Sequence, residues 1–434
     1  MTSAASITNK GRGLLALYSV NFIGAVGLSL VMPFLVFLVE DFGGNAIVYG
    51  MVGASFSFFQ LIGAPLIGRY SDRAGRRKAL LISQMGTLIA WCVLFIALIA
   101  PKTTLLQIES GWLGSFSVTV PLLILVAARS LDGLTGGNIS VANAYLVDVS
   151  TESDKAQNFG RMASASNLGF ILGPMAGGIL GATIYREQLP VAFAALVAFI
   201  GLFLIFKYLP ERKPVTIDDA PCKNVNRRIL GKEAKDSFDR KAEVSGLSTI
   251  LHIKCVRSML VLYFIIFLAF NLFYTAFPSH ASRTLGWDST QLGLFFAFLS
   301  GIMIVVQGPV LKRAVERFGE SAMAIWGCFF MVGSFSMFSL GSTPMAFVSA
   351  ALFALGNGLM WPSFMSILGS LGSKAQQGTI QGFATSAGSL ASIIGLLSGG
   401  IFYTSIGANT FALGAGVFSV ALLTMLITFR RLSC

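Results

Sequence analysis

The sequence predicts an all-α membrane protein with about twelve transmembrane helices in two pseudo-symmetric six-helix bundles. Three observations lead to this prediction. First, 55% of the residues are hydrophobic and 12% are charged, whereas soluble domains carry roughly 25% charged residues. Second, the apolar residues fall in runs of about 20, the length that crosses a hydrocarbon core of about 30 Å. Third, short motifs recur between the two halves of the chain.

Each apolar run is expected to be a helix, because a backbone in lipid must satisfy its own hydrogen-bonding groups. A transmembrane barrel would instead show alternating strands of about ten residues. The expected spans are 14–39, 47–67, 79–100, 119–147, 162–184, 190–209, 258–279, 290–311, 322–341, 345–369, 382–403 and 408–429. They divide the chain into an N-terminal bundle (1–209), a polar cytoplasmic linker (210–257) and a C-terminal bundle (258–434).

The positive charges are distributed unequally between the two sides of the membrane. With the N-terminus in the cytoplasm, three of the 31 Lys and Arg residues fall in the opposite loops, namely Lys102, Arg186 and Arg283. Cytoplasmic loops carry the excess of Lys and Arg, so both termini are expected in the cytoplasm. The plasma (inner) membrane or an organelle membrane would hold the protein. The net charge of +12 then reflects topology, and no nucleic acid partner is expected.

The residues that usually build metal or redox sites are scattered. The five cysteines include no Cys-x-x-Cys pair, and the two histidines lie far apart. This spacing argues against a disulfide framework or a zinc site, so we expect no metal and no cofactor. The sequence contains no nucleotide-binding loop and no plausible nucleophile arrangement, so an enzyme is not expected. The expected partners are the lipid bilayer, a small-molecule substrate and protons, and the expected state is a monomer.

The two halves of the chain share three short patterns. Pro65, Arg69, Asp72, Arg73 and Gly75 match Pro309, Arg313, Glu316, Arg317 and Gly319. Lys155-Ala156-Gln157 matches Lys374-Ala375-Gln376, and Gly173 with Gly177-Gly178 matches Gly395 with Gly399-Gly400. Each half has six expected spans, so both halves enter the membrane from the same side. Repeats of this kind are related by an axis along the membrane normal, as in transporters that rock one half against the other.

The loop after the second span reads Gly-Arg-Tyr-Ser-Asp-Arg-Ala-Gly-Arg-Arg-Lys over residues 68–78. Gly75 permits a tight turn, and Asp72 can lie at the positive N-terminal end of a neighbouring helix. The loop resembles the signature loop of the major facilitator superfamily. The resemblance implies a gating loop that latches the cytoplasmic side shut. Its residues would be Gly68, Asp72, Arg73, Gly75 and Arg76, with Glu316 and Arg317 in the second half.

The fourth span contains Arg129 and, three residues later, Asp132. A charge at the centre of a bilayer costs about 2.5–3.5 kcal/mol on insertion scales, so such residues face a cavity or a partner. The surrounding residues resemble the helix-4 motif of the superfamily, in which the arginine is linked to proton movement. Asp132 is then the expected proton carrier. The alternative is an ion pair that only positions the helix.

The fifth span carries Gly169, Gly173, Pro174, Gly177 and Gly178, and this pattern resembles a motif of antiporters in the superfamily. Glycine at every fourth position forms one stripe that lets the helix pack closely against a neighbour. Proline removes a hydrogen-bond donor and can kink the helix. The alternative is ordinary packing of small residues.

Within the superfamily, the chain is similar to tetracycline-resistance efflux proteins, a type of drug:proton antiporter. The resemblance rests on Leu30-Val31-Met32-Pro33, Tyr49-Gly50, Gln60, Ala64-Pro65, 144–148 and Leu209-Pro210-Glu211. Gly24 and Ala90 stand where that family has acidic residues in helices 1 and 3, and the span 322–341 contains no acid. Recognition of a tetracycline–metal complex is therefore not carried over to this chain.

In the superfamily, helices 1, 4, 7 and 10 line a central cavity. The candidate substrate-binding residues on these spans are Asn21, Asn138, Asn271, Tyr274, Asn357 and Trp361. Amides and aromatic rings with one carboxylate suit an amphiphilic, neutral or cationic compound. The alternative is that each asparagine bonds a neighbouring helix.

The sequence thus favours export of a small, drug-like compound in exchange for protons by alternating access. One alternative is proton-coupled or facilitative uptake of a sugar or another metabolite on the same fold. An alternative of another class is a transporter-like membrane receptor.

Overall fold

A computed structural model describes residues 2–31, 34–110, 114–150, 155–211, 251–371 and 374–433. The first half contains α1 (Thr2–Leu30), α2 (Leu35–Asp41), α3 (Ala46–Ala74), α4 (Arg76–Ile99), α5 (Val120–Thr135), α6 (Asn138–Val149), α7 (Lys155–Gly181) and α8 (Gln188–Tyr208). The second half contains α12 (Val256–Arg283), α13 (Ser289–Val305), the π-helix η1 (Val306–Val310), α14 (Leu311–Phe318), α15 (Glu320–Phe338), α16 (Thr343–Ser370), α17 (Lys374–Ile406) and α18 (Asn409–Ser433). The expected linker lies largely outside the described residues, which omit 212–250.

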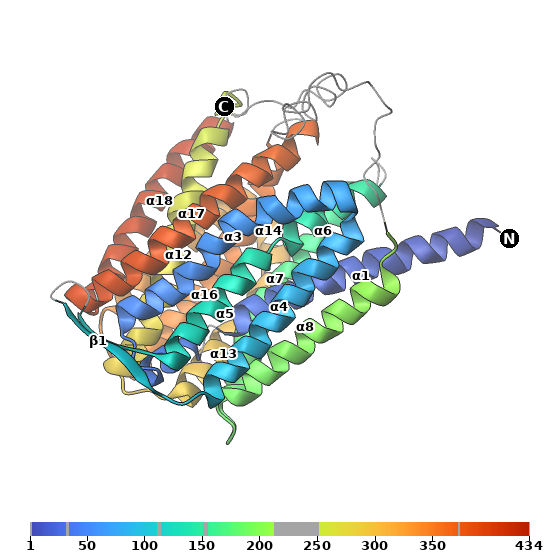
Figure 1. Ribbon diagram of the computed structural model, residues 1–434. Coiled ribbons are helices and arrows are strands. Elements are labelled where there is room, and N and C mark those ends of the chain that lie inside the picture. Colours follow the sequence, from blue (N-terminus) through green and yellow to red (C-terminus); the bar gives the residue numbers. More distant parts are fainter. Residues whose placement is uncertain are drawn as a thin grey trace.

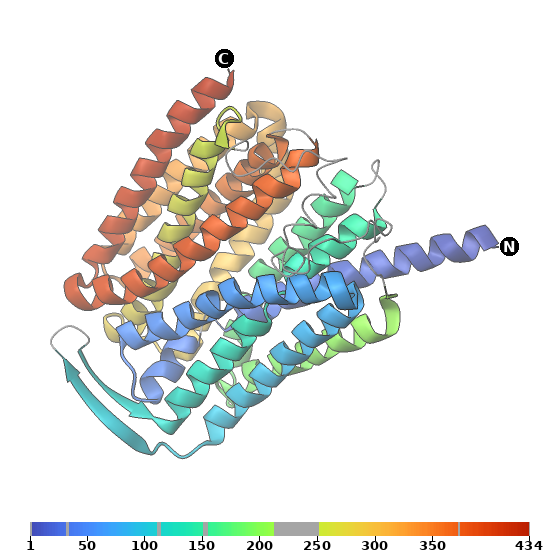
Figure 2. The same cartoon turned by 45° about the horizontal axis from the view of Figure 1, so that its top comes forward.

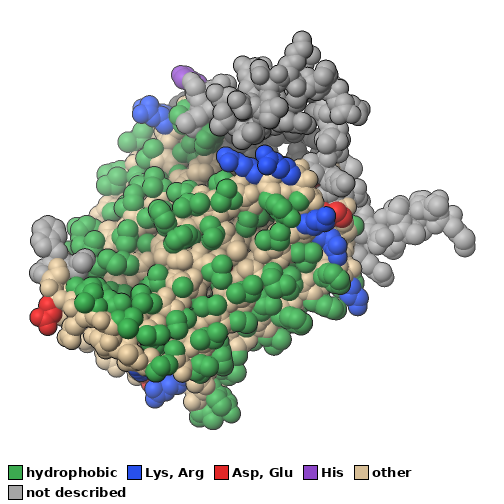
Figure 3. All heavy atoms as spheres, in the orientation of Figure 1, with side chains coloured by type: hydrophobic (Ala, Val, Ile, Leu, Met, Phe, Trp, Pro, Cys, Tyr) green, Lys and Arg blue, Asp and Glu red, His purple; other side chains and the backbone are tan. Residues whose placement is uncertain are grey.

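The described residues include twelve helices that are long and apolar enough to cross a membrane, and this confirms the predicted fold class. Figure 3 shows hydrophobic side chains over the flank, with basic groups gathered toward the two ends. Large apolar residues such as Ile99, Phe206 and Leu423 are exposed by 66%, 65% and 61%. A surface of this kind fits lipid and would be a liability in water.

Three expected spans are interrupted. The span 119–147 divides into α5 and α6 at Gly136-Gly137, because paired glycines weaken the helical ladder. The span 290–311 passes through η1, which contains Pro309, and a proline removes one backbone donor. The span 14–39 includes the separate helices α1 and α2, and residues 32–33 between them lie outside the described part.

One further element was not predicted. The connection between α4 and α5 contains an antiparallel hairpin of β1 (Thr104–Ser110) and β2 (Gly114–Thr119). The Ser117 amide donates to the Gly43 carbonyl at 2.9 Å, and Lys102 pairs with Asp41 at 2.6 Å. These contacts fix the hairpin to one end of the bundle, which we call the hairpin end (Figure 1). The opposite end, with residues 68–78 and the last turn of α18, is the loop end.

The two six-helix bundles meet through α3 with α17 and through α7 with α13. At the hairpin end the contact is backbone to backbone. A Cβ added at Gly178 would fall on the Gly293 carbonyl, and one added at Gly400 would lie 2.5 Å from the Ala46 carbonyl oxygen. Figure 2 shows the bundles diverging from this contact toward the loop end.

At the loop end the same helices are separated. Within the described residues, no atom beyond the local helix backbone lies within 4 Å of the Cβ position of Gly68, Gly160, Gly308 or Gly382. Gly68, Gly160 and Gly382 come from α3, α7 and α17, which form the contact at the hairpin end, and Gly308 comes from η1, which follows α13. The structure is therefore closed at the hairpin end, and the backbone contacts that close it are not repeated toward the loop end.

Candidate functional site

A buried ion pair lies inside the first bundle. Arg129 Nη1 is 3.4 Å from Asp132 Oδ2, and both side chains are buried. Residues three apart lie on one face of a helix, so α5 directs both toward α3 and α4. The Arg129 guanidinium lies 4.7 Å from the centre of the Phe56 ring, and Thr87 forms a side-chain hydrogen bond with Asp132. The charged pair on α5 is therefore in contact with side chains of both α3 and α4.

Close packing of glycines brings Phe56 to Arg129. A Cβ added at Gly133 of α5 would fall on the Phe56 carbonyl, and one added at Gly63 of α3 would fall on the Leu134 carbonyl. The two backbones are thus in direct contact at Gly133 and Leu134, immediately after Asp132. Within the described residues, Arg129 Nε has no hydrogen-bond partner. A buried donor of this kind can bind a new acceptor without breaking an existing bond.

The ion pair lies next to a contact between the two halves. The Tyr49 hydroxyl of α3 donates to the Tyr274 carbonyl of α12 at 2.9 Å. Tyr49 and Arg129 interact electrostatically. The side chain that joins the bundles therefore lies near the buried charge.

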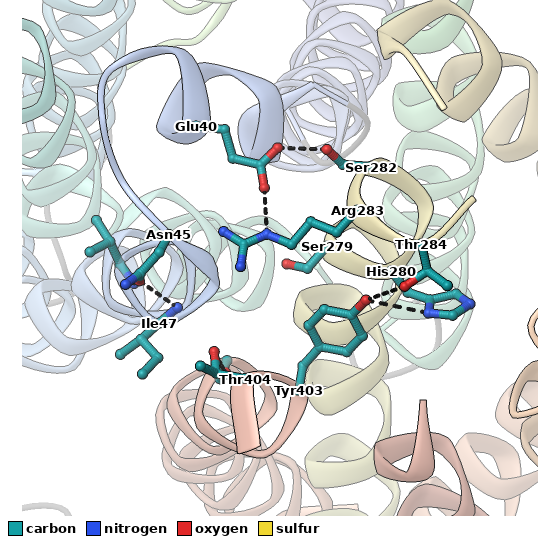
Figure 4. Close-up of polar contacts among 12 residues, drawn as sticks. Glu40, Asn45, Ile47, Ser279, His280, Ser282, Arg283, Thr284, Tyr403 and Thr404 are labelled. Atoms are coloured by element: carbon teal, nitrogen blue, oxygen red, sulfur yellow. Dashed lines mark hydrogen bonds and ion pairs between the residues drawn. The ribbon is translucent and has the colours of Figure 1, made fainter. Parts of the chain in front are cut away.

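A second set of polar contacts joins the halves at the hairpin end (Figure 4). Glu40 Oε1 accepts from Arg283 Nε at 2.9 Å, and Glu40 Oε2 accepts from the Ser282 hydroxyl at 2.6 Å. We call these three residues the hairpin-end gate. Beside it, Tyr403 of α17 is hydrogen-bonded to Thr284 at 2.9 Å. Sequence reasoning missed the gate, because Glu40 and Arg283 are 243 positions apart and only a folded chain brings them together.

Glu40→Gln should weaken closure of the hairpin end by about fivefold or less, because a partly exposed ion pair contributes at most about 1 kcal/mol. The measurement is the labelling rate of a cysteine placed at Ile47, which is 2% exposed, in a background without native cysteines. The matched control is Asp41→Asn, which breaks the neighbouring pair with Lys102 inside one half. Equal labelling rates in both variants would contradict a gating role for Glu40.

The gating-loop residues predicted from the sequence lie apart from their counterparts. Arg76 pairs with Asp72 at 2.5 Å and with Asp148 at 2.8 Å, so it joins α3, α4 and α6 within the first half. The Asp72 side chain is 62% exposed. Gly75 has a φ of 107°, a conformation that favours glycine. Arg73 of the first half, and Glu316 and Arg317 on α14, are likewise exposed at the loop end.

The glycines of α7 divide between two neighbours. Gly169, Gly173 and Gly177 pack against the α1 backbone, whereas Gly178 meets Gly293 of the other half. The second half repeats this arrangement, since Gly395 and Gly399 pack on α12 and Gly400 meets α3. The helix continues through Pro174. In each half, one glycine of the Gly-Gly pair faces its own bundle and the next faces the other bundle.

Two of the candidate substrate residues bond neighbouring helices. Asn21 donates to the Ser166 hydroxyl of α7 and to the Met162 carbonyl at 3.2 Å. Asn271 donates to Ser392 of α17 at 3.0 Å and to the Phe267 carbonyl at 2.8 Å. Their amides are thus used in helix packing, which was the alternative interpretation of these residues.

The other candidates do not form a single cluster. Asn138 lies against α1, with its Nδ2 atom 2.8 Å from the Cβ position of Gly24. Tyr274 contacts the other half through its backbone carbonyl, which accepts the hydrogen bond from Tyr49. Asn357 contacts the Met303 sulfur at 3.9 Å, and its buried Oδ1 has no partner within the described residues.

Trp361, four residues after Asn357 on α16, belongs to an aromatic cluster in which Tyr263 and Phe364 are buried and Phe267 and Trp361 are partly buried. Its ring lies 5.3 Å from Tyr263 and 5.2 Å from Phe267, and 5.9 Å from Phe364. We call these four residues the aromatic wall. The sequence pointed to Trp361 alone, since the partners on α12 become neighbours only through helix packing.

Comparison with known proteins agrees with this architecture. The model of the Major Facilitator Superfamily matches residues 17–258 and 259–433. The chain is 26% identical to the class D tetracycline resistance protein of Salmonella ordonez, over 87% of this chain and 86% of the relative. The crystal structure of the human organic anion transporter MFSD10 matches with a TM-score of 0.66 at 23% identity, covering 96% and 99% of the two chains. That of a D-xylose–proton symporter matches with a TM-score of 0.69 at 16% identity, covering 95% and 96%.

Proposed function

Because the chain belongs to the Major Facilitator Superfamily and is a multi-pass membrane transporter by family and fold, we propose that it exports a small amphiphilic compound in exchange for protons. The observation that carries this proposal is the buried Arg129–Asp132 pair beside the Tyr49–Tyr274 contact between the halves. We place the loop end in the cytoplasm, because Lys78, Lys207 and Arg430 lie at that end and cytoplasmic segments carry the excess of basic residues.

Asp132 is the proposed site of proton exchange. While ionised, its carboxylate pairs with Arg129 and lowers the cost of burying both charges. A proton bound at Asp132 removes that partner, so the Arg129 guanidinium must find another acceptor or water. Phe56 and Tyr49 lie beside the guanidinium, and its own Nε atom has no partner among the described residues. A change of charge here therefore acts on α3, the helix that contacts the other half.

The two ends of the molecule support alternating access. The hairpin end is held by backbone contacts at Gly178 and Gly400 and by the hairpin-end gate, whereas the loop end is separated. In the opposite state, Asp72 and Glu316 at the loop end would approach the partner bundle and latch the cytoplasmic side. A substrate entering from the loop end would leave through the hairpin end after the gate opens.

The aromatic wall supports an amphiphilic substrate. Aromatic rings offer large apolar contact area, and the buried Asn357 Oδ1 lies one helical turn before Trp361 without a partner among the described residues. Leaving a buried acceptor unpaired costs about 1–3 kcal/mol, so a substrate N–H or O–H group would be stabilised there. This combination favours a compound with an apolar, flat body and at least one donor group.

The test is proton movement in sealed vesicles that contain the purified protein and a trapped pH-sensitive dye. Compounds are first selected by thermal shift, because a ligand of the folded state raises its apparent stability. Adding a selected compound on one side should drive protons to that side, and protein-free vesicles are the control. A compound that crosses through the protein without any pH response would contradict antiport and would favour facilitative transport, the second candidate on this fold.

A further inference from the structure

A basic cleft lies at the loop end of the second bundle, away from the aromatic wall and from the Arg129–Asp132 pair. It has a volume of about 500 Å³ and is lined by Lys254, Cys255, Ser258, Arg430 and Arg431. The first three residues lie at the beginning of α12 and the last two at the end of α18. The Cys255 sulfur contacts the Thr428 carbonyl at 3.9 Å, so the two helix ends are held together around the cleft.

The cleft is strongly positive. Within the described part of the chain, no carboxylate lines it, and none of its three cations forms an ion pair. In addition, α12 is 28 residues long and begins here without a side-chain cap. Uncapped N–H groups at a helix N-terminus point outward and favour an anion. Three unpaired cations thus line one cavity at the N-terminus of α12, where the Val256 amide is already bonded to the Ile253 carbonyl at 3.1 Å.

The depth of the cleft corresponds to the membrane surface. The apolar span of α12 begins at Val256 and that of α18 ends at Arg431, so the cleft lies where the lipid headgroups begin. Basic pockets between transmembrane helices at this depth bind anionic headgroups.

The surface below the cleft is apolar and exposed. Leu423, Leu426 and Ile427 are exposed by 61%, 36% and 56%, and they precede Arg430 by seven, four and three positions, on the same face of α18. On α12, Val261 is 47% exposed and follows Ser258 by three positions. An anion in the cleft would therefore have hydrophobic surface directly beneath it, on the side that faces lipid.

We propose that this cleft binds the phosphate headgroup of an anionic membrane lipid, with its acyl chains along α12 and α18. A soluble phosphate would use the cations and the helix N-terminus but would gain nothing from the apolar surface below. The site joins the first turn of α12, where the chain returns from residues 212–250, to the last turn of α18. It does not depend on the proposed substrate or on proton exchange.

The test is a titration of the purified full-length protein with dioctanoyl phosphatidylglycerol, followed by native mass spectrometry. Arg430→Gln/Arg431→Gln should weaken binding by about 10–30-fold, because a basic residue at a membrane surface contributes about fivefold. Lys254→Gln alone should weaken it by about fivefold. The matched control, Lys78→Gln/Lys207→Gln, removes two exposed charges from the loop end of the first bundle and should change binding by less than about twofold.

Equal weakening in the control and in the cleft variants would overturn the proposal, because the effect would then be one of net charge. Unchanged binding in the cleft variants would also overturn it. Inorganic phosphate serves as the second probe and should compete only at far higher concentration. Competition by inorganic phosphate at the same concentration as the lipid would assign the site to a soluble anion and overturn the lipid assignment. Thermal melting of every variant verifies that the fold is intact.

Discussion

Asp132→Asn is expected to reduce substrate-driven proton movement to the level of protein-free vesicles. Asparagine has nearly the shape of aspartate but cannot exchange a proton near neutral pH. Exchange of labelled for unlabelled compound without a proton gradient should persist, because the helices that form the pathway remain. The measurement is the vesicle assay with the trapped dye, run beside the exchange assay. If a proton gradient still drives transport in this variant, the carrier lies elsewhere.

Two further variants separate proton chemistry from folding. Asp132→Asn leaves Arg129 as an uncompensated buried charge, and breaking a buried pair in this way costs about 3–5 kcal/mol. Arg129→Met/Asp132→Asn removes both charges and should regain melting temperature while remaining uncoupled. Glu109→Gln is the matched control, because it neutralises an exposed carboxylate on β1 and should leave coupling unchanged.

Gly178→Ala is expected to disfavour closure of the hairpin end. The added methyl group would fall on the Gly293 carbonyl, and a backbone oxygen cannot rotate away as a side chain can. Overpacking costs about 1–3 kcal/mol, which is a shift of about 5–150-fold in the population of the closed state. The cysteine at position 47 should therefore label faster by a comparable factor.

Neighbouring glycines provide the controls for Gly178. Gly181→Ala lies in the same helix, and its nearest contact would be Pro190 Cγ at 3.9 Å, so it should behave like the parent. Gly177→Ala would meet the Leu30 carbonyl inside the first bundle and should lower the melting temperature without changing the labelling rate. Parental labelling in Gly178→Ala would show that this contact does not hold the hairpin end closed.

The sequence predicted the glycine motif of α7 but not which of its glycines contacts which bundle. Gly177 and Gly178 are adjacent, so they face directions about 100° apart on a helix. Periodicity predicts that one stripe packs closely, and it leaves open which helix the next residue meets. The structure resolves this, because Gly293 lies opposite Gly178 and Leu30 lies opposite Gly177.

The asparagines also show that the sequence marks polar residues in the membrane without identifying their partners. A polar side chain in lipid must find a partner. This rule and their place on spans that line the cavity in the superfamily made Asn21 and Asn271 candidates for contact with a substrate. Their partners, Ser166 and Ser392, are 145 and 121 positions away. No local pattern indicates such distant hydrogen bonds. Asn357, by contrast, retains an unpartnered oxygen within the described residues, and only the packed structure distinguishes it from the others.

The sequence by itself determined the twelve spans and their duplicated motifs, because the bilayer imposes the same length and the same internal hydrogen bonding on every span. Tertiary structure decided the breaks at Gly136-Gly137 and in η1, the hairpin β1–β2, the partners of the buried polar groups and the end at which the halves meet. These features depend on contacts between helices far apart in the chain, such as Glu40 with Arg283. Interactions of this kind differ by only a few kcal/mol between the two states of a rocking bundle, so no local preference of the chain selects one of them.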